Sequence, residues 1–261
     1  MVLKKLLSVI GVYKVYEKWL WYQLKNYAKP EHVAIILDGN RRWAAEQDFN
    51  PWLGHKKGAD TVEQLLVWCE KLGVKSVTLY AFSTENFRRT YEEIQEIMRI
   101  AEEKFRKLLV DERIHRNRVH VKVIGRVNLL PESLQQLIGE VEEATASYDN
   151  QFLNFAFAYG GRAEIVDAAK IIAEKVKSGE LSIDDVNEAT VEKYLYTSHM
   201  PNQEPDLIVR TSGEERLSGF LLWQAAYSEL CFLDVYWPDF RLIDLLRAFR
   251  TFQRRKRRYG A

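Results

Sequence analysis

The sequence lacks several features that would narrow its function at once. It has only two cysteines, Cys69 and Cys231, which stand among apolar neighbours without metal-ligand spacing. This pattern argues against a disulfide framework or a zinc site and indicates a reducing, intracellular setting, so we expect a cytoplasmic protein. There is no repeat period and no low-complexity tract, and the polar stretch 177–187 is too short to be a linker. With 47% hydrophobic side chains, the 261 residues can bury a substantial core.

Charge of one sign is not in excess either. The chain has 38 Lys and Arg against 37 Asp and Glu, a formal net charge of +1. Such a balance gives no overall attraction for nucleic acid, and the basic tail 254–258 is typical of a solvated helix end. The common nucleotide signatures are also missing: no G-x-x-x-x-G-K-[ST] exists, and Gly160-Gly161-Arg162 does not complete G-x-G-x-x-G. Nucleotide hydrolysis and dinucleotide redox chemistry thereby lose their best support.

No apolar run is long enough to cross a membrane. Residues 6–27 are rich in apolar and aromatic side chains, but Lys14 and Lys18 interrupt them before the roughly 20 residues that a spanning helix needs. No small-residue cleavage site follows, which argues against a signal peptide. Apolar residues at helical spacing predict an amphipathic helix in residues 1–28, ahead of a main domain in residues 29–261. This helix either packs on its own domain or lies at a membrane interface, where it would make peripheral contact.

What the sequence does contain is a regular alternation of strand and helix patterns. Six apolar or β-branched runs predict strands at 33–37, 76–82, 120–125, 152–159, 206–211 and 230–235. Segments of helical period separate most of them, among them 61–72, 91–109 and 163–176. The alternation predicts an α/β fold: a single domain with a mostly parallel six-stranded sheet and helices on both faces.

Polar clusters follow four of the predicted strands, at 38–42, 83–89, 160–162 and 210–218. The carboxyl ends of parallel strands share one edge of a sheet, where open α/β sheets bind ligands. Arginine binds phosphate oxygens with two N–H groups, and glycine lets the backbone come close, so these clusters predict a site for a diphosphate. Asp38 would either pair with the arginines or hold Mg²⁺ against a phosphate. Glu229 is a second acidic candidate, because its apolar surroundings make an idle charge costly.

Five blocks together resemble one known family, the cis-prenyltransferases, which include the undecaprenyl and dehydrodolichyl diphosphate synthases. The blocks are HVAIILDGNRRW at 32–43, GHKKGA at 54–59, TLYAFSTENFRR at 78–89, RTSGEERLSGFLLWQ at 210–224, and AYSELCF with VYWPDF at 226–240. They occur in the family's order, and the resemblance covers about residues 30–260. It implies a homodimeric α/β enzyme with a hydrophobic product cleft. Such an enzyme adds isopentenyl diphosphate repeatedly to an allylic diphosphate, with Mg²⁺, and makes cis double bonds.

The resemblance also implies roles for individual residues. Asp38 corresponds to the family's essential aspartate, which places Mg²⁺ and the departing diphosphate, and Asn86 to the asparagine near the reacting carbons. The residues that match the allylic substrate site are Gly39, Asn40, Arg42, Trp43, His55, Phe87 and Arg89. The isopentenyl diphosphate site corresponds to Arg210, Arg216 and Ser218, and the second Mg²⁺-associated acid to Glu229. Arg258 and Gly260 match an R-x-G ending that reaches the partner subunit's active site in several members.

Five positions depart from the pattern of the bacterial members: Arg41, Pro51, Phe87, Ser212 and Gly219. Arg41 stands where glycine is usual and adds positive charge beside the diphosphate site. Pro51 stands where bacterial members carry a phosphate-binding arginine, so contacts to the allylic diphosphate are expected to differ. The primer therefore stays open between farnesyl and geranylgeranyl diphosphate, and the proton acceptor between Asn86 and a diphosphate oxygen. Two other functions are also considered: a non-catalytic accessory subunit of a heteromeric prenyltransferase, and a phosphohydrolase.

Overall fold

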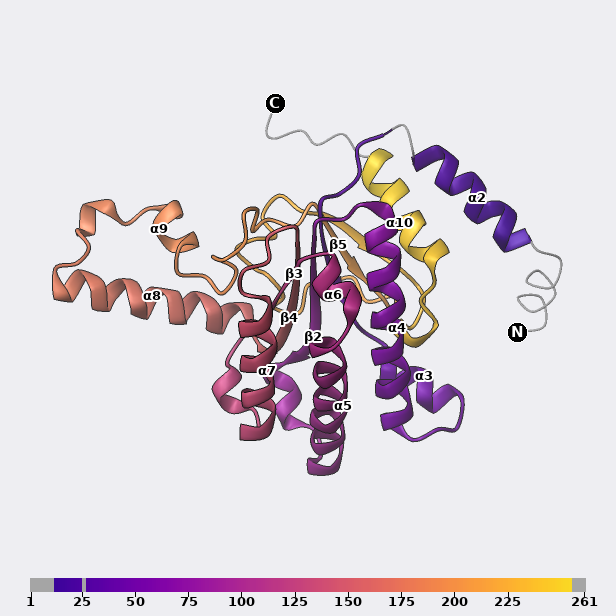
Figure 1. The fold of residues 1–261 in the computed structure, drawn as a ribbon, viewed down its shortest axis with the longest axis horizontal. Helices are drawn as coiled ribbons and strands as arrows, with labels where there is room; N and C mark the ends of the chain where they lie inside the picture. The colour runs from indigo at the N-terminus through magenta and orange to yellow at the C-terminus, as the bar shows by residue number, and fades with distance from the viewer. Residues whose placement is uncertain (1–11, 25–26, 255–261) are drawn as a thin grey trace.

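The computed structural model describes residues 12–24 and 27–254, and its centre is a single six-stranded sheet (Figure 1). The strands are β1 His32–Ile36, β2 Ser76–Ser83, β3 Val119–Ile124, β4 Gln151–Tyr159, β5 Leu207–Arg210 and β6 Glu229–Phe232. Their order is β3-β4-β2-β1-β5-β6, and every neighbouring pair is parallel. The predicted α/β class, with one mostly parallel sheet flanked by helices, is confirmed.

The last strand is shorter than the sequence predicts. β6 ends at Phe232 rather than at residue 235. Past this point the carbonyls of Leu233 and Val235 accept hydrogen bonds from the backbone of Gly213 and Ser212, at 2.9 and 2.7 Å. After Phe232 the chain therefore stops pairing with β5 and instead bonds to the turn that follows β5. The strand pattern of the sequence does not reveal this change of partner.

One face of the sheet carries a layer of four helices, labelled in Figure 1: α4 Pro51–Leu72, α5 Tyr91–Leu109, α7 Glu132–Thr145 and α10 Leu242–Arg254. Their apolar sides form the main core with alternate sheet residues such as Ile35, Leu79 and Val121. Helix α5 has the predicted bounds. Helix α4 begins ten residues before the predicted start at residue 61, because packing overrides the low helix propensity of its two early glycines.

The opposite face of the sheet has a different cover. Its residues, among them Ala34, Tyr80 and Tyr159, pack against Phe220 and Leu221 in the irregular segment 211–228, which follows β5. The expectation of helices on both faces is therefore wrong for much of this face. Helix α8, Gly161–Ser178, and the short helix α9, Glu188–Glu192, instead extend to one side of the sheet, at the left of Figure 1.

The described part of the N-terminal helix, α2 Val12–Leu24, packs on α10. Leu20 and Leu24 are fully buried, and three arginines, one just before α10 and two within it, lie over aromatic rings of α2 in the pairs Arg241–Tyr13, Arg247–Tyr16 and Arg250–Trp19. This packing favours the first interpretation of the helix, attachment to its own domain. Residues 1–11 lie outside the described part, so the boundary at residue 28 stays a prediction. Among the described helices, none has both the length and the apolar character to span a bilayer.

Candidate active site

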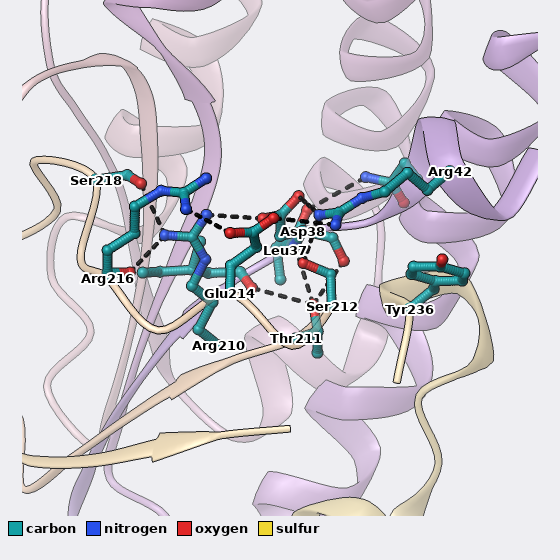
Figure 2. Close-up of polar contacts among 12 residues, drawn as sticks. Leu37, Asp38, Arg42, Arg210, Thr211, Ser212, Glu214, Arg216, Ser218 and Tyr236 are labelled. Carbon is teal, nitrogen blue, oxygen red and sulfur yellow. Dashed lines mark hydrogen bonds and ion pairs between the residues drawn. The ribbon is translucent and has the colours of Figure 1, made fainter. Parts of the chain in front are cut away.

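The site is centred on Asp38, two residues past the end of β1. Its backbone N–H donates to Thr211 Oγ1 at 3.0 Å, and the Thr211 hydroxyl donates to the Asp38 carbonyl at 2.7 Å. Because β5 lies beside β1, this exchange holds the two strand ends together. The carboxylate accepts hydrogen bonds from Arg210, at 2.8 Å to Oδ2, and from Arg42, at 3.3 Å to Oδ1 (Figure 2). The carboxyl edge of the sheet thus places an acid between two arginines, as predicted.

Arg210 is held from several sides. Its side chain is only 5% exposed, and Nη1 donates both to the Ser218 hydroxyl at 2.7 Å and to the Arg216 carbonyl. Within the described residues its buried Nε finds no acceptor. A buried guanidinium with an unused donor is suited to bind a further anionic oxygen.

Arg42, on α3 Asn40–Glu46, connects Asp38 to the loop after β5. It donates to Ser212 Oγ at 2.7 Å and to Glu214 Oε1 at 3.1 Å, and Glu214 also pairs with Arg216 (Figure 2). The turn before α3 depends on Gly39, which has φ 104° and whose added Cβ would lie 2.7 Å from Tyr236 Cδ1. A side chain at this position would push the start of α3, and Arg42 with it, away from Asp38.

A second cluster forms around Glu93, in the first turn of α5. His55 Nε2 lies 3.1 Å from Glu93 Oε1, Arg89 Nη1 lies 3.0 Å from it, and Arg41 Nε lies 3.6 Å from it. These three groups come from α4, from the loop before α5 and from α3. The structure therefore brings the predicted substrate residues His55 and Arg89 together through an acid that sequence reasoning did not select.

Asn86 and Asn40 have local structural contacts. Asn86, in the 3₁₀ helix η1 Thr84–Arg88, accepts a hydrogen bond from the Ser83 backbone N–H at 2.9 Å through Oδ1. Asn40 donates to the Leu37 carbonyl at 3.3 Å, and its Oδ1 is buried without a partner among the described residues. An added Cβ on Gly58 would lie 2.3 Å from this Oδ1. The glycines of the GHKKGA block thus allow α3 and α4 to approach closely.

Burial and the neighbouring charges shift the pKa values of two groups in the site. Burial alone would raise the pKa of Asp38, but Arg210, Ser212 and Arg42 together hold it below its usual value, so the group stays a carboxylate. Burial lowers the pKa of His55, and the nearby Arg89 and Arg41 lower it further, while the hydrogen bond with Glu93 opposes them.

An apolar cavity of about 200 Å³ begins beside this site. Leu37, Asn40 and His55 line it at the carboxyl edge of the sheet, and Lys75 and Gln151 line it at the opposite edge. Its walls come from the sheet and from α4 and α5, with Val62, Leu66, Val67, Ile97, Ala101 and Phe105 among them. We call this cavity the channel.

Other predicted residues lie apart from the cluster or outside the described chain. Glu229 starts β6 and pairs in register with Leu207, whereas Asp38 is bonded to Thr211, four residues further along. Four steps of a strand are about 13 Å, so the two predicted metal ligands lie toward opposite edges of the sheet. Trp43 packs on Phe49, and Phe87 packs in the core on Phe82, with ring centroids 6.0 and 5.0 Å apart. Arg258 and Gly260 lie outside the described residues.

Two functional candidates had not been selected from the sequence, Glu93 and Glu214. Thr90-x-x-Glu93 matches a capping box and signals the start of a helix, which hides any further role. Glu214 stands in the expected anion-binding loop, but nothing in the sequence indicates that it would pair with Arg42 and Arg216. Both carboxylates are recognised as candidates only in the tertiary structure, where arginines surround them.

The residues present fit a bound Mg²⁺. Mg²⁺ is usually held by one or two carboxylates and by substrate phosphates, with water completing the shell. Asp38 is ionised, partly exposed and surrounded by arginine and hydroxyl groups of the kind that can bind phosphate, which suits such a shared site. Within the described part of the chain no group of three or more His, Cys, Asp or Glu forms a self-contained metal site.

Fold and site together define the class of protein. Arginines around a carboxylate at the mouth of an apolar channel are suited to a ligand with an anionic head and an apolar tail. The chain belongs to the undecaprenyl diphosphate synthase family, whose model matches residues 36–260. It is therefore a prenyltransferase, which confirms the family and the enzyme class predicted from the sequence.

Several relatives support this assignment. The chain is 54% identical over 253 residues to the tritrans,polycis-undecaprenyl-diphosphate synthase (geranylgeranyl-diphosphate specific) of Methanopyrus kandleri, covering 97% of this chain and 93% of the relative. It is 52% identical over 248 residues to the enzyme of the same name from Pyrococcus horikoshii, covering 95% and 93%. Among solved structures, lavandulyl diphosphate synthase from Lavandula x intermedia in complex with dimethylallyl diphosphate has a TM-score of 0.86 and 37% identity over 89% of this chain and 99% of that one.

Proposed function

We propose that this enzyme adds isopentenyl diphosphate repeatedly to geranylgeranyl diphosphate and makes a long-chain polyprenyl diphosphate with new cis double bonds. The observation that carries this is the pair of cationic clusters, around Asp38 and Glu93, next to the mouth of the apolar channel. Of the two primers left open by the sequence, geranylgeranyl diphosphate is favoured because the relatives are named as specific for it.

Charge stabilisation is the main task of the Asp38 cluster. As the allylic C–O bond breaks, the diphosphate leaves with the bonding electrons, and Arg42 neutralises its growing charge. Asp38 and diphosphate oxygens would hold Mg²⁺, which when bound supplies further neutralisation. Arg210 and Ser218 hold the isopentenyl diphosphate, whose double bond attacks the cationic carbon. A proton is then lost, and the lengthened chain occupies the channel.

The proton acceptor is a diphosphate oxygen in this proposal. Asn86 Oδ1 already accepts the Ser83 N–H, which orients the amide so that its remaining polar group is the NH₂. An NH₂ group donates hydrogen bonds and cannot remove a proton. Asn86 would therefore orient a diphosphate oxygen next to the reacting carbons.

A product assay tests the proposed function. Purified protein is supplied with radiolabelled isopentenyl diphosphate and with one primer at a time, farnesyl or geranylgeranyl diphosphate, in Mg²⁺ or in EDTA. We expect long products from geranylgeranyl diphosphate in Mg²⁺ only. Release of phosphate or diphosphate without a longer chain would support the phosphohydrolase. No turnover by folded protein with either primer would support the accessory subunit, which the intact Asp38, Asn86 and Arg210 argue against.

We also propose a homodimer, in which Glu229 of one chain serves the site of the other. Since Glu229 lies about 13 Å along the strands from the level of Asp38, it cannot join the same metal site within one chain. The arm formed by α8 and α9 offers a surface, because Val166, Ile171 and Ile183 are 48%, 39% and 68% exposed. Mixing Asp38→Ala with Glu229→Gln chains should restore activity in the mixed dimers. Two inactive variants that stay inactive when mixed would contradict the shared site.

Peripheral membrane contact is the remaining proposal. The side of α2 that faces away from α10 exposes Lys14, Val15, Lys18 and Tyr22, a mixed basic and apolar surface. Tyr22 and Tyr91 are both 71% exposed but lie on different helices, so Tyr91 can serve as the control position for Tyr22. Tyr22→Ala should weaken co-sedimentation with anionic phospholipid vesicles, and Tyr91→Ala should not. Equal binding by wild type and both variants would exclude α2 as the contact.

A further inference from the structure

We propose that Glu93 is a positioning residue that holds His55, Arg89 and Arg41 as one cationic set for the allylic diphosphate. The inference rests on the proposed function, and it assigns a role to a residue outside the predicted site. Glu93 carries only 10% exposure on its side chain and occupies the first turn of α5.

The geometry is convergent. His55 Nε2, Arg89 Nη1 and Arg41 Nε all approach the same oxygen, Glu93 Oε1, at 3.1, 3.0 and 3.6 Å. Each donor comes from a different element, so loss of this one oxygen would release three separate segments at once. No other carboxylate in the described salt bridges is shared by two arginines and a histidine.

The charge balance suits an anionic ligand. One negative charge faces two arginines, with a histidine at the same oxygen, and this excess of positive charge is costly in a half-buried site without another anion. Arg41 remains 60% exposed and Arg89 25% exposed, and each uses only part of its guanidinium on Glu93. The unused N–H groups are available to phosphate oxygens, as they would be for a ligand with more than one negative charge.

The position of the cluster identifies which anion. His55 lines the mouth of the channel, and Ile97, one helical turn after Glu93, lines its wall. An allylic diphosphate with its tail in the channel would have its head beside these cations. Burial lowers the pKa of Arg89, while the charges of Glu93 and Asp38 act to raise it, so this set lies within electrostatic range of the cluster where the allylic bond would break. Glu93 would fix the donors in place before the substrate arrives, so that little reorganisation is needed in the transition state.

The test compares Glu93→Gln with Glu92→Gln in the full chain. Glutamine keeps the size of Glu93 and removes its charge, and Glu92 is an exposed acid one residue away on the same helix. Steady-state kinetics with geranylgeranyl diphosphate and isopentenyl diphosphate are measured for both, together with thermal unfolding. For Glu93→Gln we expect KM for the allylic substrate to rise and kcat to fall, each by about tenfold or more, with KM for isopentenyl diphosphate within about twofold. Glu92→Gln should match wild type.

The outcomes separate the inference from the proposed function. If wild type and Glu92→Gln elongate chains and Glu93→Gln does so equally well, Glu93 has no positioning role and only the inference fails. Equal increases in both KM values with a lower Tm would assign Glu93 to the fold alone. Absence of elongation by wild type would instead overturn the proposed function.

Discussion

The carboxylate of Asp38 and the guanidinium of Arg210 lie 2.8 Å apart, although 172 residues separate them in the chain. Their meeting follows from the strand order, since β1 and β5 are neighbours and Ile36 pairs in register with Arg210. Each side chain thus leaves the same edge of the sheet. The pair joins the family's aspartate to the loop expected to bind isopentenyl diphosphate, which in the proposed mechanism puts the two substrates next to each other.

Asp38→Ala should abolish most chain elongation while the protein stays folded. Loss of a preorganised charge in an active site costs on the order of 10²–10³ in turnover. Arg210 would keep its bonds to Ser218 and to the Arg216 carbonyl, so unfolding at 25 °C is not expected. Turnover and circular dichroism are the measurements, with Asp184→Asn in the exposed 3₁₀ helix η3 Ile183–Asp185 as control. Near wild-type turnover in the alanine variant would remove Asp38 from the mechanism.

Gly58→Ala should destabilise the protein and reduce activity together. The new Cβ would lie 2.3 Å from Asn40 Oδ1 and 3.0 Å from Trp237 Cδ1, which forces α3 away from α4 at a cost of about 1–3 kcal/mol. Gly139→Ala, in α7 with open space around it, should instead stabilise by about 0.5–1 kcal/mol. Urea unfolding compares the two. A Gly58 variant as stable as the Gly139 variant would contradict the close approach of α3 and α4.

The buried His32 should make stability depend on acid pH. It is 1% exposed, bonds Thr78 Oγ1 at 2.9 Å, and burial lowers its pKa from 6.5 to about 4. Between these values the unfolded chain binds the proton more readily, so stability falls as pH decreases from 6.5 to 4, by up to about 3 kcal/mol. Relative to His32→Gln, which does not titrate, wild type should lose its advantage over this range. A stability difference that is constant with pH would show that His32 does not titrate on unfolding.

Ala101→Phe should shorten the product. Ala101 is 8% exposed and lines the channel on α5, so a benzyl group there would occupy space proposed for the growing chain. Overpacking should cost about 1–3 kcal/mol, which thermal unfolding can detect. Thin-layer chromatography compares the products of wild type, Ala101→Phe and Val110→Phe. Val110 is 74% exposed at the end of α5, so Val110→Phe serves as the control. An unchanged product length with the Ala101 variant would place the chain elsewhere.

The second face of the sheet is covered in a way that local sequence patterns do not predict. Segment 211–228 has turns, bends and left-handed residues such as Ser218 and Leu221, with φ 49° and 46°, so it lacks the period of either helix or strand. Its apolar residues nevertheless bury Tyr80 and Ile124 on the second face. An alternation of strand and helix patterns predicts layers of helices on a sheet. An irregular segment can bury the same sheet face, but it has no hydrophobic period by which the sequence would reveal it.

The sequence by itself determined the strand positions to within a few residues, the parallel α/β class and the family, because hydrophobic period and contiguous motifs act over short stretches of chain. It also located Asp38, Arg42 and Arg210 at strand ends. Only the tertiary structure decided that Glu93 gathers two arginines and a histidine, that Glu214 links two arginines, and that Glu229 lies away from Asp38. An ion pair depends on where two distant segments meet, and among 37 acidic residues no local feature distinguishes those that meet arginines from those that meet water.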